Sequence, residues 1–159
     1  MVALSCVSPT IRLTEAARGC YLVETQTDST ARMRLDPSGR PVHGPLQSAT
    51  ESRPPWREVL RLETGVAPRE PMGADRPDRY VARFSSDPPR HPELAWWAVR
   101  GDTIRVVRGM GFSMQEYWVQ IRGDTLVGRG AEMTDDMWYA AFAVQGHRTA
   151  CVRPNGQAI

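Results

Sequence analysis

The chain has 159 residues, of which 41% are hydrophobic and 24% charged, as in a globular protein with one domain and its own core. A formal net charge of only +2 gives nucleic-acid binding no compositional support, and no apolar run approaches the roughly 18–20 residues that cross a bilayer. All twenty basic residues are Arg, which excludes chemistry that needs a lysine, such as Schiff-base formation.

The N-terminal third predicts a tail, a helix and two strands. We expect residues 1–9 to form a flexible tail and residues 10–159 to form a single β-barrel domain. Residues 10–18 predict a short helix that Gly19 ends. Strand patterns follow at 20–25 and 31–35, and a loop rich in Pro, Gly and Ser spans 36–55.

The next two strand patterns alternate between the faces of a sheet. In the segment 56–64 the inward face would carry Trp56, Glu58, Leu60 and Leu62. In the segment 78–85 it would carry Tyr80, Ala82 and Phe84. Loops at 65–77 and 86–92 separate these strands from the rest of the chain.

Residues 94–131 contain the same sequence motif twice, first at 96–104 and again at 118–126. Each copy has Gly-Asp between two β-rich runs, a tight-hairpin signal because both residues tolerate positive φ. The predicted strands are 93–100, 103–109, 112–122 and 125–132, followed by an apolar run at 137–144 and a bend at Gly146. We therefore expect an all-β protein, an up-and-down antiparallel barrel of about 8–10 strands with a short N-terminal helix; a sandwich is the alternative.

The three cysteines bear on a possible disulfide and on the cellular compartment of the protein. Cys20 opens the first strand pattern and Cys151 follows the last, so the two ends of a closed sheet could be joined by a Cys20–Cys151 disulfide. That pairing would indicate a secreted or periplasmic protein; two buried free thiols are the alternative. Cys6 is then left over, and lipid attachment there is conceivable.

Three short motifs resemble those of the lipocalin or calycin group of secreted barrels. Gly19-Cys20-Tyr21 opens the first strand, where lipocalins have Gly-x-Trp. Thr134-Asp135-Asp136 precedes a late strand, as does the family's Thr-Asp-Tyr turn. The resemblance implies that Arg148 or Arg153 packs on the aromatic residue of the first strand, and that the barrel is lipocalin-like.

A barrel of about eight strands can hold one small ligand. Apolar and aromatic side chains suit an adaptable pocket for a small apolar ligand, and a fully packed core is the alternative. The predicted ligand-binding residues are Tyr80, Phe84, Trp96, Phe112, Met114, Trp118 and Phe142.

One carboxylate stands among these apolar positions. Strict alternation puts Glu116 on the same face as Phe112, Met114 and Trp118, where a carboxylate would need a partner or a raised pKa. Arg105 or Arg108 on the preceding strand could be that partner. These three residues are the catalytic candidates if the protein is an enzyme, with Glu116 as acid or base; an outward bulge or a structural ion pair is the alternative. Glu24 and Glu58 have weaker claims of the same kind.

The sequence therefore leaves three hypotheses open. The first is an exported protein that binds an apolar or amphipathic ligand in the barrel lumen. The second is a cofactor-independent barrel enzyme, and the third is a structural or protein-interaction domain with a packed core. We expect no cofactor, and no metal site, because His43, His91 and His147 lack metal-ligand spacing. The segment 109–118 is the first place to look for a site.

Overall fold

The computed structural model describes residues 9–35, 41–42, 56–66, 79–87, 95–110, 113–134, 138–152 and 155–158. Within these residues one helix, α1 (Pro9–Ala17), precedes nine strands. The strands are β1 (Gly19–Leu35), β2 (Pro41–Val42), β3 (Arg57–Val66), β4 (Tyr80–Phe84), β5 (Ala95–Arg100), β6 (Thr103–Met110), β7 (Ser113–Arg122), β8 (Thr125–Thr134) and β9 (Trp138–Thr149).

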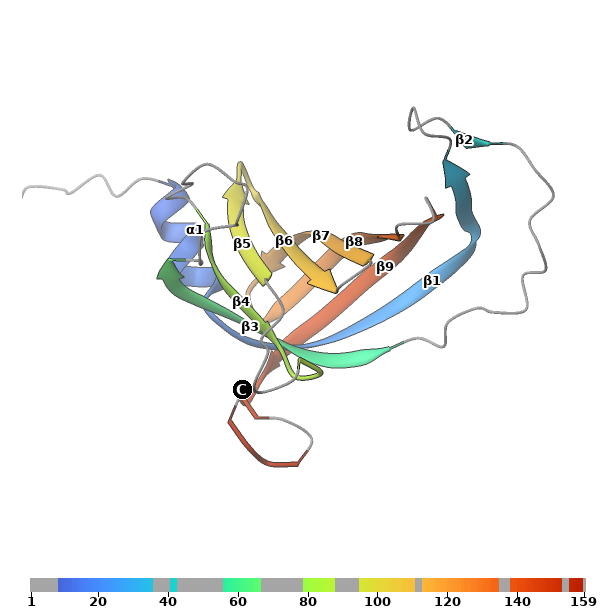
Figure 1. Ribbon diagram of the computed structural model, residues 1–159. Coiled ribbons are helices and arrows are strands. Elements are labelled where there is room, and N and C mark those ends of the chain that lie inside the picture. The colour runs from blue at the N-terminus through green and yellow to red at the C-terminus, as the bar shows by residue number, and fades with distance from the viewer. Residues whose placement is uncertain are drawn as a thin grey trace, which may run out of the picture.

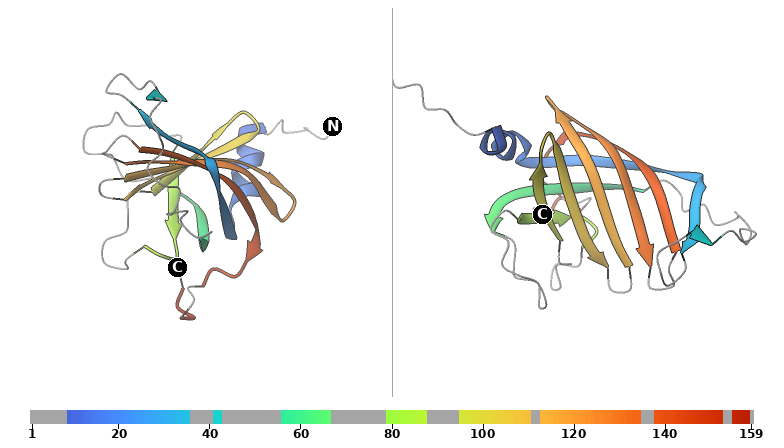
Figure 2. Two further views of the ribbon diagram at one scale, coloured as in Figure 1. Left: turned by 90° about the vertical axis from the view of Figure 1, so that its right-hand side faces the viewer. Right: turned by 90° about the horizontal axis from the view of Figure 1, so that it is seen from above.

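The sheet is antiparallel and closed. Each strand from β3 to β9 pairs with the next along the chain, β1 pairs with β3 on one side and with β9 on the other, and β2 extends the far end of β1 (Figure 1). Eight strands thus form an up-and-down barrel, which confirms the predicted fold class. Figure 2 shows β1 crossing the sheet beside both β3 and β9.

The two predicted hairpins are present. In each, two residues connect the strands, because Arg100 pairs with Thr103 and Arg122 with Thr125. Gly101 has a φ of 65° and Gly123 a φ of 61°, the left-handed conformation that these turns require. Both hairpins therefore lie at the same end of the barrel, and they fix the register of β5 to β8.

Two strands are longer than predicted. The patterns at 20–25 and 31–35 belong to a single strand, β1, whose pairing with β9 shifts register between Thr27 and Arg32. The predicted bend at Gly146 is wrong: β9 continues through it to Thr149. A Cβ at Gly146 would lie 3.0 Å from the carbonyl oxygen of Leu22, so the absence of a side chain here serves close pairing with β1.

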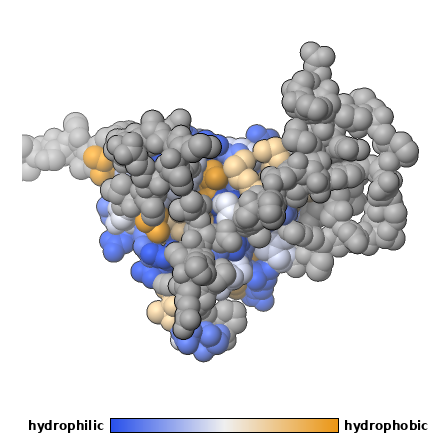
Figure 3. Space-filling view, viewed as in Figure 1, coloured by the Kyte–Doolittle hydropathy of each residue, from blue (hydrophilic) through white to orange (hydrophobic). Residues whose placement is uncertain are grey.

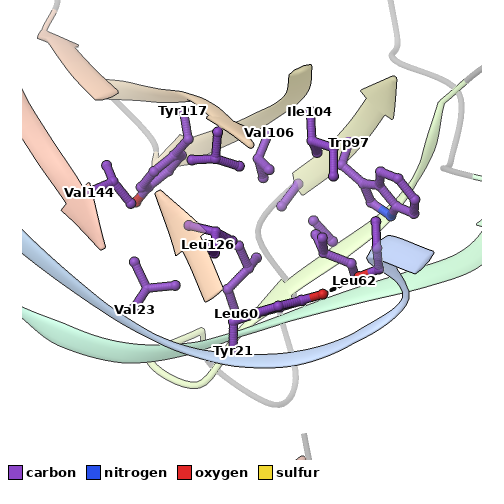
Figure 4. Packing of buried hydrophobic residues seen from close by; sticks show 14 of the residues in the cluster. Tyr21, Val23, Leu60, Leu62, Trp97, Ile104, Val106, Tyr117, Leu126 and Val144 are labelled. Carbon is purple, nitrogen blue, oxygen red and sulfur yellow. Dashed lines mark hydrogen bonds between the residues drawn. The ribbon is translucent and has the colours of Figure 1, made fainter. Parts of the chain in front are cut away.

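Apolar side chains fill the barrel from the end covered by α1. Figure 4 shows side chains from strands on opposite sides of the barrel pointing toward one another. Trp97, Tyr21, Leu62, Ile104 and Leu126 are all less than 2% exposed. Leu13 and Ala17 of α1 pack on the same cluster, so the helix closes this end of the barrel.

Arg148 of β9 ties α1 to the first strand. Its guanidinium lies 5.0 Å from the centre of the Tyr21 ring, and it donates hydrogen bonds to the carbonyl oxygens of Arg18 (2.9 Å) and Ala16. The Tyr21 hydroxyl donates to the carbonyl of Ala17 at 3.0 Å. The expectation that Arg148 packs on the first-strand aromatic is confirmed, and the same side chain satisfies carbonyls at the helix C-terminus.

The predicted disulfide joins Cys20 to Cys151, whose Cα atoms lie 5.2 Å apart. It links the start of β1 to the residues that follow β9, on the outer face of the barrel beside Leu22 and Val59. Cys6 lies outside the described residues. No helix in the described ranges combines the length and apolar character needed to cross a membrane.

Candidate functional site

A layer of buried polar side chains lies across the barrel at the end away from α1. Arg108 of β6 is the centre of this layer and is flanked in register by Ala95 on one side and Gln115 on the other. Gln115 in turn pairs with Glu132 of β8. Arg108, Gln115 and Glu132 are 5%, 2% and 7% exposed, so these polar groups have left water on the inner face of the sheet.

Two carboxylates and a hydroxyl surround the Arg108 guanidinium. Nη1 donates to both Glu58 carboxylate oxygens at 3.3 Å, and Nη2 donates to Asp87 Oδ1 at 2.5 Å and Ser86 Oγ at 2.9 Å. The Ser86 hydroxyl donates to Glu58 Oε2 at 2.5 Å, which closes a ring of hydrogen bonds. We call Glu58, Ser86, Asp87, Arg108, Gln115, Tyr117 and Glu132 the polar layer; Ser86 is its exposed member, and the other six are buried.

The turn after β4 delivers two of these groups. Asp87 Oδ2 accepts a hydrogen bond from the backbone nitrogen of Phe84 at 3.0 Å, and the backbone nitrogen of Asp87 donates to the Phe84 carbonyl at 3.1 Å. An Asp side chain that closes its own turn in this way holds the turn from Phe84 to Asp87 in one conformation. The second carboxylate oxygen of Asp87 is thereby fixed toward Arg108.

Burial shifts the ionisation of the layer. Burial raises the pKa of Glu58, while the charge of Arg108 and hydrogen bonds from Ser86 and Trp56 oppose that rise. Burial also raises the pKa of Tyr117, whose hydroxyl donates to Gln115 Oε1 at 3.0 Å. Glu58 thus holds a proton to higher pH than an exposed glutamate does.

One donor of the layer has no acceptor in the part of the chain that the structure describes. Among the described residues, the buried Nε of Arg108 has no hydrogen-bond partner, although its two Nη atoms have several. A buried, unpaired donor costs about 1–3 kcal/mol, and most buried polar groups in folded proteins have a partner in the protein or in ordered water.

Four predicted site residues lie inside the barrel: Tyr80, Phe84, Phe142 and Arg108. The three rings pack edge-on or stacked against other aromatic rings, with centroid distances of 4.9 Å from Tyr80 to Trp97, 5.8 Å from Phe84 to Tyr117 and 4.8 Å from Phe142 to Trp56. These ring contacts lie in the barrel interior, and the Arg108 guanidinium lies 4.4 Å from the centre of the Phe84 ring.

The other described candidates lie on the outer face, contrary to our prediction: Trp96, Met114, Trp118, Glu116 and Arg105. Trp96 and Met114 belong to a small outer cluster with Ala98 and Val107, separate from the main core. Glu116 pairs with Arg105 there, and the side chain of Glu116 is 14% exposed. Glu116 therefore shares a face with Met114 and Trp118 as predicted, but that face points out of the barrel.

The inward face of β7 is the other one. Tyr117 and Val119 are each 1% exposed, and they lie opposite Val106 and Ile104 of β6. Strand β5 gave no clue to its orientation, because all residues from Ala95 to Val99 are buried. The alternation pattern is ambiguous in such a segment, since both faces are apolar. Phe112 lies outside the described residues.

Sequence reasoning found only part of the polar layer. It placed Glu58 on an inward face and named Arg108 as a possible partner of a carboxylate, but it assigned that carboxylate to Glu116. Ser86, Asp87, Gln115, Tyr117 and Glu132 were missed. Gln115 and Tyr117 carried a usable signal, because they alternate in step with Val119 and Ile121.

The outer face carries a separate hollow of about 710 Å³ over β5 to β8. Two of the predicted residues, Arg105 and Trp118, are part of its lining. The complete lining is Arg100, Thr103, Arg105, Trp118, Gln120, Arg122, Val127, Gly128 and Arg129, which we call the outer groove.

No known family model matches the chain, and no curated protein is detectably similar to it in sequence. What the structure shows is a closed antiparallel barrel in which Arg148 packs on Tyr21 of the first strand.

Proposed function

We propose that the protein is an exported binding protein that holds a small amphipathic ligand in the barrel, with the polar end of the ligand at Arg108. The observation that carries the proposal is the buried Nε of Arg108, which lacks a partner among the described residues. A ligand oxygen that accepts this hydrogen bond would complete the polar layer. A closed barrel of eight strands has the size that encloses one small ligand.

The surroundings of Arg108 favour a neutral oxygen acceptor over a carboxylate. Glu58 and Asp87 already contact the guanidinium, so a third carboxylate would meet like charge in a medium of low dielectric constant. A hydroxyl or carbonyl oxygen would avoid that repulsion. Trp56, Phe84 and Phe142 lie beside the layer and would contact an apolar body.

Export is supported by the Cys20–Cys151 disulfide, because such bonds persist in oxidising compartments such as the periplasm or the exterior of the cell. The disulfide also ties the start of β1 to the residues that follow β9 on the outer face of the barrel. The proposed location is therefore secreted or periplasmic.

The test is a titration of Trp fluorescence, checked by native mass spectrometry, with retinol, a long-chain alcohol and the fatty acid of equal length. We expect binding of the first two with 1:1 stoichiometry and weaker binding of the acid. Arg108→Met should abolish it, whereas Arg12→Met on the exposed surface of α1 should not. If Arg108→Met does not fold, Glu58→Gln keeps the guanidinium and should still bind.

Failure of all three compounds to bind the wild-type protein would contradict the proposal. It would favour the alternative of a structural or protein-interaction domain, which the packed rings of the described interior also suit.

The raised pKa of Glu58 favours a second candidate, a cofactor-independent enzyme in the same barrel. A carboxylic acid whose pKa is raised by burial and that lies beside a guanidinium can act as a general acid. Glu58 would take the role that the sequence suggested for Glu116, with Arg108 stabilising negative charge, in an isomerisation, cyclisation or hydrolysis. Loss of turnover of an apolar ester or epoxide in Glu58→Gln, with ligand binding retained, would support this candidate; equal turnover would exclude it.

A further inference from the structure

The outer groove has a row of Arg, Trp and Arg across three strands. In the register of the sheet, Trp118 of β7 lies directly opposite Arg105 of β6 on one side and Arg129 of β8 on the other. Directly opposed side chains in a sheet have Cβ atoms about 4.5–5.5 Å apart. One indole ring is therefore flanked by two guanidinium groups, and Arg100 and Arg122 add two more near the hairpin ends.

Positive charge in the outer groove exceeds the negative charge that contacts it. Arg105 pairs with Glu116, and Asp102 accepts a hydrogen bond from Gln120 at 2.8 Å. Arg122 donates a hydrogen bond to the neutral amide oxygen of Gln120 at 3.0 Å, and it has no ion pair within the described residues. Within the described part of the chain, Arg129 has neither a hydrogen bond nor an ion pair. Two of the four guanidinium groups, those of Arg122 and Arg129, thus have no carboxylate partner among the described residues.

The shape of the groove selects the kind of anion. A hollow of about 710 Å³ lies within the range of roughly 300–1,000 Å³ that small-molecule sites occupy. Of the exposed large hydrophobic residues in the described ranges, only Val127 lines it, and Ile11, Met133 and Val152 lie elsewhere. A membrane would need a cluster of apolar side chains to enter it, and Figure 3 shows hydrophobic residues only in small patches on the face in view.

We propose that the outer groove binds an acidic oligosaccharide. Its carboxylate or sulfate groups would receive paired hydrogen bonds from Arg129 and Arg122, a geometry that the guanidinium fork supplies. The apolar face of a sugar ring would pack on Trp118, and Thr103 and Gln120 would hydrogen-bond its hydroxyls. This site is on the opposite face of the sheet from Arg108, so it is independent of the barrel ligand.

The test is isothermal titration with a heparin-derived tetrasaccharide and with trigalacturonate, and with maltotriose as the neutral match. We expect at least one acidic oligosaccharide to bind, with affinity that falls as salt rises, and no heat from maltotriose. Arg129→Met should weaken binding about tenfold, the value of one charge-assisted hydrogen bond. Because Arg129 is exposed and has no partner in the described ranges, the variant should keep its fold.

Arg12→Met removes the same charge from α1 and should bind like wild type. Three results would overturn the proposal: no binding of either acidic sugar, equal weakening by Arg12→Met and Arg129→Met, or binding of maltotriose as tight as that of trigalacturonate. Vesicles containing phosphatidylglycerol are the fourth arm. Arg129-dependent binding to these vesicles without sugar binding would also overturn it and identify a membrane as the occupant.

Discussion

Loss of the Cys20–Cys151 disulfide should destabilise the barrel strongly. The two cysteines are 131 residues apart in sequence, so the bond restricts most of the unfolded chain. The chain-entropy relation gives about 5 kcal/mol for a loop of this length at 25 °C, and measured losses are typically about 2–5 kcal/mol. The folded barrel should survive, because β1 and β9 remain paired from Cys20 and Thr149 onward.

Urea unfolding with and without reductant measures this loss, and the double variant Cys20→Ser/Cys151→Ser should match the reduced protein. The Cys6→Ala variant is the control, since it keeps the disulfide and prevents exchange with a third thiol. A loss below about 1 kcal/mol would refute the reasoning, because it would mean that the bond restricts the unfolded chain little. Free Cys20 and Cys151 in a non-reducing peptide map would refute the pairing itself.

Three further predictions concern the interior and the helix. Because the pKa of Glu58 is raised in the folded protein, its protonated form contributes to the free energy of unfolding. This contribution is complete below the ordinary carboxyl pKa and is lost as pH rises through the raised pKa. Glu58→Gln should therefore flatten the pH dependence of stability in urea unfolding from pH 4 to 8, and an unchanged slope would contradict this prediction. A Cβ at Gly130 would lie 2.1 Å from the Phe142 ring, so Gly130→Ala should cost about 1–3 kcal/mol in urea unfolding, while Gly65→Ala, with 3.9 Å of clearance, should stay within about 0.5 kcal/mol. Arg148→Met should cost about 1–2 kcal/mol and speed hydrogen exchange in α1, and an unaltered exchange rate would show that Arg148 does not anchor the helix.

The architecture could be predicted where the local signals were unambiguous. The Gly-Asp hairpins fixed four strands, because positive φ at Gly101 and Gly123 admits few other turns. Alternation fixed the inward faces of β3 and β4, where charged residues such as Arg57 and Arg83 mark the wet side. The sequential hairpins favoured closure into a barrel, because a closed sheet has no open edges.

The candidate site could be predicted only in part. On β5 both faces are apolar. On β7 one face carries Met114 and Trp118, and the other carries Tyr117 and Val119. Alternation alone therefore could not show which face points into the barrel. Apolar residues also pack on the outer face, where Trp96 and Met114 form a cluster with Ala98 and Val107. The Arg79 guanidinium covers Trp96 there, 3.9 Å from its ring centre.

The polar layer depends on contacts between distant segments. Glu58 lies on β3, Asp87 follows β4 and Arg108 lies on β6, so the three residues meet only in the folded barrel. Arg108 and Glu58 are 50 residues apart in sequence. Nothing local distinguishes Asp87 from the other acidic residues in loops. Such long-range pairs are specified by the register of the whole sheet and are therefore absent from any single sequence pattern.

The most direct test of the proposed function is the NMR signal of the Arg108 Nε–H group, assigned by its disappearance in Arg108→Met. Among the described residues this proton has no acceptor in the unliganded protein. Addition of the long-chain alcohol or retinol should shift the signal and slow its exchange with water, since a ligand oxygen would then accept its hydrogen bond. Binding of the ligand with the Arg108 signal unmoved would contradict the proposal that the polar end of the ligand lies at Arg108.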